Sequence, residues 1–308
     1  MCRTIWDFIV IEDRDAAAVN EIGVTTKPYA SWNEIKKMLA KFDRGWIFRC
    51  QRYADWSLQT SLETWKKNNW GTKDRTGNLI LEQIEEGILL KEFKREANNY
   101  FSSSCQKPGN TLEWLALMQH YGCPTRLLDF TYSPYVAAFF AFDECYNKNG
   151  AIWCVNADWC KERSVQKYNK EFHKEIKEGK KEEITILADF GKEETFQDFW
   201  KNPKALSMVF PVNPAHANER LAIQQGVFLC TGSSQSFKGN IDAMSEGENH
   251  YLKYILKIVV SSEARKEAIV DLNRMNINNA TLFPGLEGYA KSLKDKFWIE
   301  GSLGTSYN

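Results

Sequence analysis

The chain has 308 residues, 43% of them hydrophobic and 13% aromatic, which is enough to bury the core of one large domain. Forty Lys and Arg residues balance 40 Asp and Glu residues, so the formal net charge is zero and a protein-wide basic field for nucleic acid is excluded. The sequence shows no signal-peptide pattern and no apolar run of about 18 residues, so we predict a cytoplasmic protein without a membrane partner.

The eight cysteines are scattered along the chain, with no CxxC pair and no histidine at the spacing of a zinc ligand. Such usage is typical of a reduced, cytosolic protein whose thiols lie mostly in the core. The spacing therefore predicts no metal site.

We predict that the first 45 residues cover the main domain and do not form a separate domain. Residues 5–11 are rich in β-formers and predict a strand at a sheet edge. A helix is expected over 31–42, because Ser31 and Glu34 have the spacing of a capping box.

A short apolar strand is predicted at 46–48, and it runs out into Arg49 and Gln51. An arginine at a strand end can hold a phosphate or carboxylate through its planar guanidinium. The alternative is that Arg49 pairs with Glu92 or Glu96 on the helix predicted over 79–101. A shorter helix, starting near Ser61, and polar loops at 71–78 and 102–110 complete this part.

The segment from 113 to 142 is the most informative part of the sequence. A helix over 111–121 with Thr111 as N-cap ends at Gly122, a strand follows at 125–130, and Pro134 opens an apolar, buried helix. The polar residues stand where these elements turn: Gln119, His120, Thr125, Arg126 and Asp129. They predict a site. The alternative is structural, with an Arg126–Asp129 ion pair fixing the turn and His120 favoured by the helix dipole.

The second half of the chain continues the alternation of strands and helices. Lysines interleave with glutamates over 159–183, which predicts a solvated helix and hairpin within a charged insertion at 159–205, with a nucleic-acid contact as the alternative. Gln224 and Gln225 precede a strand and offer amide groups suited to a base or an amide. The other expected elements are strands at 151–155, 207–212, 227–231 and 251–260, a short helix with Glu219 and Arg220, a polar loop at 233–240, helices over 261–276 and 281–299, and a disordered tail at 300–308.

The stretch QHYGCPTRLLDFTYSPYVAAFFAF closely resembles the core motif of the FRG-domain family. Further pieces match in order, including WIFRCQ, ERLAIQQGVFLCTG and TLFPGLEGYAKSL, so the resemblance spans roughly 46–293 and implies an FRG-like domain over 46–299. The signature Phe-Arg-Gly reads Phe48-Arg49-Cys50 here. Close approach of a ligand to the backbone at Cys50 is therefore disfavoured. The resemblance implies a bacterial antiphage-defence or toxin-like effector.

The order of the polar pieces is similar to that of ADP-ribosyltransferases, in which a strand-end arginine or histidine, a central serine or threonine, and a late glutamate or glutamine hold NAD. This likeness implies NAD as substrate, and a protein or nucleic-acid acceptor. The implied catalytic residues are Arg49, His120, Thr131, Ser133 and Gln225, with Glu219 as an alternative to Gln225. The implied ligand-binding residues are Gln51, Gln119, Tyr121, Thr125, Arg126, Asp129 and Gln224.

The predicted fold is α+β, a mixed α/β domain with a central, mostly antiparallel sheet and helices packed on it. Two other functions stay open at this point. A non-catalytic module could use the same turn to bind a nucleotide, a nucleic acid or a phage protein, and a purely structural role for the turn is the third reading. A neutral amide at position 225 favours the binding module, because it stabilises developing positive charge less than a carboxylate does.

Overall fold

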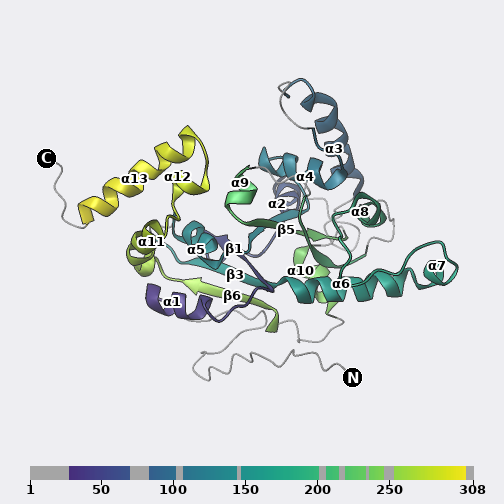
Figure 1. Cartoon of the computed structure of the whole chain (residues 1–308), viewed down its shortest axis with the longest axis horizontal. Coiled ribbons are helices and arrows are strands. Elements are labelled where there is room, and N and C mark those ends of the chain that lie inside the picture. The colour runs from purple at the N-terminus through teal and green to yellow at the C-terminus, as the bar shows by residue number, and fades with distance from the viewer. Residues whose placement is uncertain are drawn as a thin grey trace.

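The computed structural model describes residues 28–69, 83–101, 107–143, 147–200, 206–214, 219–233, 236–245 and 253–302. The predicted strand at 5–11, the loop at 71–78 and the end of the tail lie outside these residues. In the described part, the fold is α+β, as predicted, with one six-stranded antiparallel sheet (Figure 1). No described helix is long and apolar enough to cross a membrane.

The strands lie in the order β4-β5-β2-β1-β3-β6. Their bounds are β1 Trp46–Gln51, β2 Leu127–Thr131, β3 Gly150–Asn156, β4 Val209–Val212, β5 Gly226–Thr231 and β6 Ile255–Val260. The helices before β4 are α1 Trp32–Leu39, α2 Ser61–Asn69, α3 Gln83–Ala97, α4 Thr111–His120, α5 Pro134–Asp143, α6 Ala157–Glu171, α7 His173–Lys177 and α8 Glu193–Trp200. Those after it are α9 Glu219–Ile223, α10 Phe237–Met244, α11 Arg265–Arg274, α12 Asn279–Leu282 and α13 Leu286–Ser302, with a 3₁₀ turn at Ser262–Ala264.

The sheet separates two hydrophobic clusters, because successive side chains of a strand point to opposite faces. In β3, Ile152 and Cys154 join the cluster under α1, α5 and α11, whereas Trp153 and Val155 join the cluster under α4, α6, α8 and α10. The apolar helix α5 is largely buried, as its sequence predicts: Val136–Phe139, Ala141 and Phe142 are buried, and Phe140 is half-buried.

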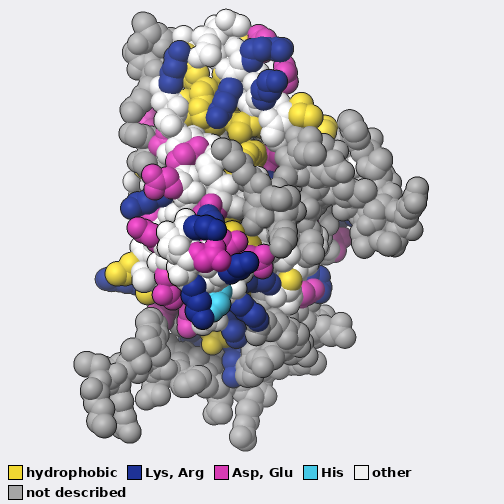
Figure 2. Space-filling view, turned by 90° about the vertical axis from the view of Figure 1, so that its right-hand side faces the viewer, with side chains coloured by type: hydrophobic (Ala, Val, Ile, Leu, Met, Phe, Trp, Pro, Cys, Tyr) yellow, Lys and Arg dark blue, Asp and Glu magenta, His cyan; other side chains and the backbone are white. Residues whose placement is uncertain are grey.

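The charged segment after β3 differs from the prediction. It forms α6 and α7 where a helix and hairpin were expected, and the hairpin is therefore wrong. Figure 2 shows Lys and Arg side chains lying among Asp and Glu on the side of the molecule that carries α6 and α7, as the interleaved sequence predicts. The later part of the segment enters the core, since the rings of Phe190, Phe196 and Phe199 are buried.

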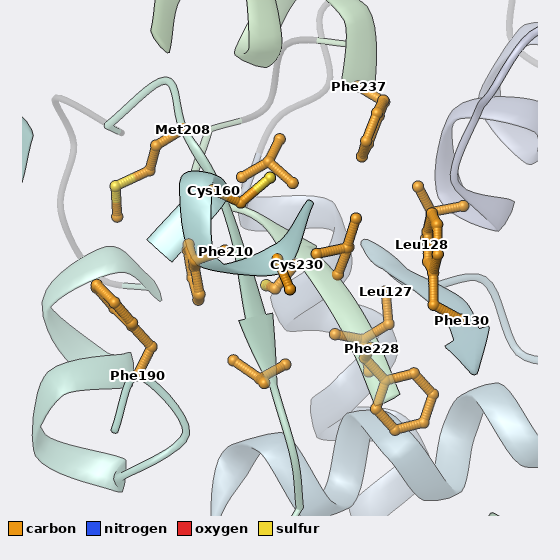
Figure 3. Close-up of a cluster of buried hydrophobic side chains, with 14 of the residues drawn as sticks. Leu127, Leu128, Phe130, Cys160, Phe190, Met208, Phe210, Phe228, Cys230 and Phe237 are labelled. Carbon is orange, nitrogen blue, oxygen red and sulfur yellow. The ribbon is translucent and has the colours of Figure 1, made fainter. Parts of the chain in front are cut away.

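Aromatic packing joins this segment to the sheet. Phe190 and Phe199 pack on Phe210 of β4, with ring centroids 5.0 and 4.9 Å apart. Figure 3 shows Phe190 and Phe210 in the same buried cluster as Leu127 of β2 and Cys230 of β5. The described part of this segment, 159–200, thus supplies core to one half of the sheet.

Smaller details of the helix ends also differ from expectation. Ser31 precedes α1, but its side chain makes no capping hydrogen bond, so the predicted capping box is absent. Asn110, and not Thr111, caps α4 by accepting a hydrogen bond from the Glu113 amide. Gly122 ends α4 with φ +80°, as predicted. The polar loop expected at 233–240 is wrong after Ser236, because α10 begins at Phe237.

A buried ion pair joins α3 to the start of β2. Arg126 Nε donates to Glu86 Oε2 at 2.6 Å, and the Arg126 backbone amide donates to Glu86 Oε1 at 2.8 Å. The guanidinium lies over the Trp200 ring, 4.6 Å from its centroid. The predicted Arg126–Asp129 pair is therefore wrong. Arg126 points into the core, because it belongs to the buried face at the strand's start.

We predict that Glu86→Ala lowers the free energy of unfolding by about 3–5 kcal/mol, because it leaves the Arg126 guanidinium buried without its carboxylate. The measurement is equilibrium unfolding in urea. Glu92→Ala on the same helix is the matched control, since its pair with Arg95 is exposed, and it should change stability by less than about 0.5 kcal/mol. Equal losses in the two variants would contradict this account.

Candidate functional site

A cavity of about 570 Å³ opens where β1, β2, α4 and α9 meet. It brings together residues from sequence segments that are far apart, as a ligand site does. Six of the predicted site residues line it: Arg49, Gln119, His120, Asp129, Thr131 and Gln224. The polar wall also includes Lys107, Glu113 and Arg220, and the aromatic wall includes Phe48, Phe130, Phe140 and Phe228.

Arg49 lies where β1 and β2 part. The two strands pair at a single position, Phe48 opposite Thr131, whereas β1 and β3 pair along their whole length. Arg49 Nη1 spans the gap and donates to the Asp129 backbone carbonyl at 2.7 Å. Its Nε is buried and has no hydrogen-bond partner among the described residues. The guanidinium is thus held at the cavity wall, and its buried Nε–H makes no hydrogen bond within the described part of the chain.

The alternative partners predicted for Arg49 are wrong. Glu92 and Glu96 both pair with Arg95 on the surface of α3, at 2.6 and 3.0 Å. Arg49 instead lies 3.6 Å from the Asp129 carboxylate, in addition to its bond to the Asp129 carbonyl.

Gln119, at the end of α4, connects the buried turn to the cavity. Its Oε1 accepts hydrogen bonds from Thr125 Oγ1 at 2.5 Å and from Ser61 Oγ at 3.2 Å. Two donors at Oε1 fix the orientation of the amide, so Nε2 faces β2. There it donates to Asp129 Oδ2 at 2.9 Å and to the Leu127 carbonyl at 3.3 Å.

Gln119 and Arg49 therefore orient Asp129. Gln119 donates a hydrogen bond to the carboxylate, and the Arg49 guanidinium lies 3.6 Å from it. Its side chain keeps 56% of its surface exposed, so part of the carboxylate stays open to the cavity.

Thr131 lines the cavity, but its hydroxyl is already engaged. Oγ1 donates to the Gln224 carbonyl at 2.7 Å and accepts from the Ser133 amide at 3.0 Å. Ser133 in turn accepts from the Val136 amide at 3.3 Å and caps α5. Thr131 and Ser133 therefore shape the backbone at this point, and Ser133 is not among the lining residues.

Of the two glutamines before β5, Gln224 reaches the cavity and Gln225 does not. Gln225 has φ +50°, and its carbonyl accepts from the Tyr132 amide at 2.9 Å, so it turns the chain into β5. Gln224 Nε2 donates to the Leu282 carbonyl in α12 at 3.0 Å.

Four further predicted residues lie away from the cavity wall. Tyr121 is 72% exposed, and Thr125 and Arg126 are buried in support of Gln119 and Glu86. Gln51 is buried and bonds to the Ser57 carbonyl.

Lys107, Glu113 and Arg220 are polar cavity residues that our site prediction missed. Arg220 lies in α9, and its guanidinium stacks over the Phe283 ring at 4.5 Å. The spacing of Arg220 and Gln224, four residues apart on a helical turn, could have placed both on one face. Glu219, the predicted alternative to Gln225, is not among the lining residues.

The electrostatics of the cavity favour a neutral His120. Partial burial lowers the pKa of this imidazole, the positive charge of Arg220 lowers it further, and the Asp129 carboxylate opposes both effects. A neutral imidazole can accept a proton. Among the described residues, no group of three His, Cys, Asp or Glu side chains could hold a metal ion.

We predict that NMR titration places the pKa of His120 below the usual value of about 6.5. Arg220→Gln should raise this pKa and Asp129→Asn should lower it, whereas Arg163→Gln on α6 should leave it unchanged. Since the folded protein binds this proton less tightly than the unfolded chain, protonation of His120 favours unfolding as pH falls. A His120 pKa at the usual value that does not change in the Arg220→Gln variant would contradict this arrangement.

Comparison with known proteins supports the resemblance seen in the sequence. The family model described as FRG domain matches residues 44–150, which include β1, α4, β2 and α5, and so much of the cavity wall. No curated protein and no solved structure matches the chain. The predicted extent of the domain, 46–299, stays a prediction beyond the matched range. The chain carries an FRG domain over residues 44–150.

Proposed function

We propose that the cavity binds NAD and that the protein transfers ADP-ribose from it to an acceptor. One observation carries the proposal: Arg49, Asp129 and Arg220, from β1, β2 and α9, meet at one cavity together with a neutral His120. This set offers cationic groups for phosphates, a carboxylate for a positively charged sugar and a proton acceptor.

The size and charge of the cavity suit a nucleotide. Its volume of about 570 Å³ falls within the range of roughly 300–1,000 Å³ that is usual for small-molecule sites. Lys107 and Arg220 offer cations at the wall, and the buried Nε–H of Arg49 offers a donor. Phenylalanine rings supply apolar surface for a base.

The chemistry assigns distinct roles to the polar residues. The bond between nicotinamide and C1′ of the ribose breaks, and nicotinamide leaves with the bonding electron pair. The acceptor's lone pair then forms a bond to C1′, and its proton passes to His120. Asp129 stabilises the oxocarbenium-like transition state, because it is a carboxylate held in place by Gln119 and Arg49. Gln224, in place of Gln225, lies at the cavity to orient the ribose.

The second candidate is a nucleotide-binding module without turnover. Two observations favour it. The Thr131 hydroxyl already donates to the Gln224 carbonyl and accepts from the Ser133 amide, and Gln224 offers an amide where a carboxylate would serve catalysis better. In either case, we propose that the protein acts in the cytoplasm as an effector of antiphage defence or as a toxin, a role that the resemblance to FRG-domain proteins supports.

The test uses the full chain, NAD and a bacterial lysate, with nicotinamide release and mass shifts on lysate protein and nucleic acid as readouts. We expect Asp129→Asn to slow nicotinamide release by about 100-fold or more while NAD binds within about threefold of its original affinity. Arg220→Gln should weaken binding by about tenfold through the loss of a charged contact.

Asp242→Asn on α10 is the matched control, since Asp242 pairs with Lys238 outside this cavity, and it should leave both quantities unchanged. Binding without nicotinamide release by the unsubstituted chain would establish the binding module. Absence of NAD binding would refute the NAD assignment, and a drop in melting temperature as the sole effect of Arg49→Ala would indicate a structural role for that residue.

A further inference from the structure

A second cavity of about 230 Å³ lies between the segment that follows β1, the strands β3 and β6, and α10. Its wall includes Trp56, Leu58, Trp153, Phe237, Ile241 and Lys257, and it shares no lining residue with the first cavity. Figure 1 shows β3 and β6 at the far side of the sheet from α9, which lines the first cavity. The second cavity is thus a separate feature of the fold.

The wall is held in place by hydrogen bonds from β1 and β3. Trp153 Nε1 donates to Gln51 Oε1 at 2.8 Å, and Gln51 Nε2 donates to the Ser57 carbonyl at 2.9 Å. Gln51 therefore connects the segment that carries Trp56 to the sheet and holds this wall of the cavity in place. A wall that is already ordered loses little conformational entropy when a ligand binds.

Trp56 presents apolar surface at this cavity. Its side chain is 51% exposed, an unusual state for so large an apolar ring, and an edge contact with Tyr53 at 4.8 Å fixes its orientation. Leu58, Phe237 and Ile241 are buried and close the apolar part of the wall. Such a wall suits a flat hydrocarbon ring.

Lys257 places a cation at the inner wall. Its Nζ donates to the Trp56 carbonyl at 2.8 Å and lies 4.8 Å from the centroid of the Trp153 ring. The rim carries Asp55 and the ion pair between Lys238 and Asp242, whose Nζ and Oδ2 atoms are 2.7 Å apart. The charge of the Asp55 carboxylate acts on Lys257, and Lys257 presents its ammonium group between Trp56 and Trp153.

We propose that this cavity binds a small molecule with one aromatic ring and a carbonyl or carboxylate oxygen. The ring packs on Trp56 and the apolar wall, and the oxygen accepts a hydrogen bond from Lys257. The volume supports a single ring, because it lies below the range of roughly 300–1,000 Å³ of sites for larger ligands such as nucleotides.

The test titrates the full chain with benzoate, benzamide and benzylammonium, followed by calorimetry and ligand-observed NMR. Benzoate or benzamide should bind saturably, with benzylammonium at least about tenfold weaker, because Lys257 repels a cation and has no acceptor to offer it. Lys257→Met should weaken benzoate or benzamide by about tenfold or more. Lys238→Met is the matched control at the rim and should change affinity by less than about threefold.

Trp56→Ala keeps the test decisive if Lys257→Met does not fold, since Trp56 is half exposed and its removal spares the core. It should also weaken binding by about tenfold. The proposal is overturned if neither benzoate nor benzamide binds, if benzylammonium binds as well as they do, or if Trp56→Ala leaves affinity unchanged. None of these outcomes bears on NAD binding at the first cavity.

Discussion

The interaction on which the rest depends is the hydrogen bond between the Gln119 amide and the Asp129 carboxylate. It joins α4 to β2 at 2.9 Å, and it is oriented from behind by Thr125 and Ser61. Without the two hydroxyl donors, the amide could turn over and present an oxygen to the carboxylate. The QHYG turn and the TRLLD strand therefore act as one unit, in which buried groups orient the half-exposed Asp129 carboxylate.

The same unit shows why polar residues near a site need not all face it. Arg126 and Asp129 are three residues apart, yet the first is buried against Glu86 and the second opens to the cavity. Arg49 has both roles, because it closes the gap between β1 and β2 and lines the cavity. A site assembled at a gap between strands obtains its rigidity from these supports.

Much of the local fold could be predicted from the sequence, and the pairings could not. Periodicity and turn residues placed α4, β2 and α5 within a few residues, since these signals act over short distances. The partners of Arg126 and Arg49 were mispredicted, because no local pattern says which distant acid a strand will meet. Likewise, the positive φ of Gln225 determines that Gln224, and not Gln225, reaches the cavity. The position of the Arg220 guanidinium depends on its stacking over the Phe283 ring, which lies far away in the sequence.

The most direct test of the central claim is a crystal structure of the chain with ADP-ribose, the part of NAD that remains after nicotinamide leaves. The account predicts that the ligand lies in the cavity lined by Arg49, Asp129 and Arg220, with a ribose near Asp129 and a phosphate or ordered water at Arg49 Nε. A structure with ADP-ribose bound elsewhere, or with this cavity holding water alone at saturating ligand, would contradict it.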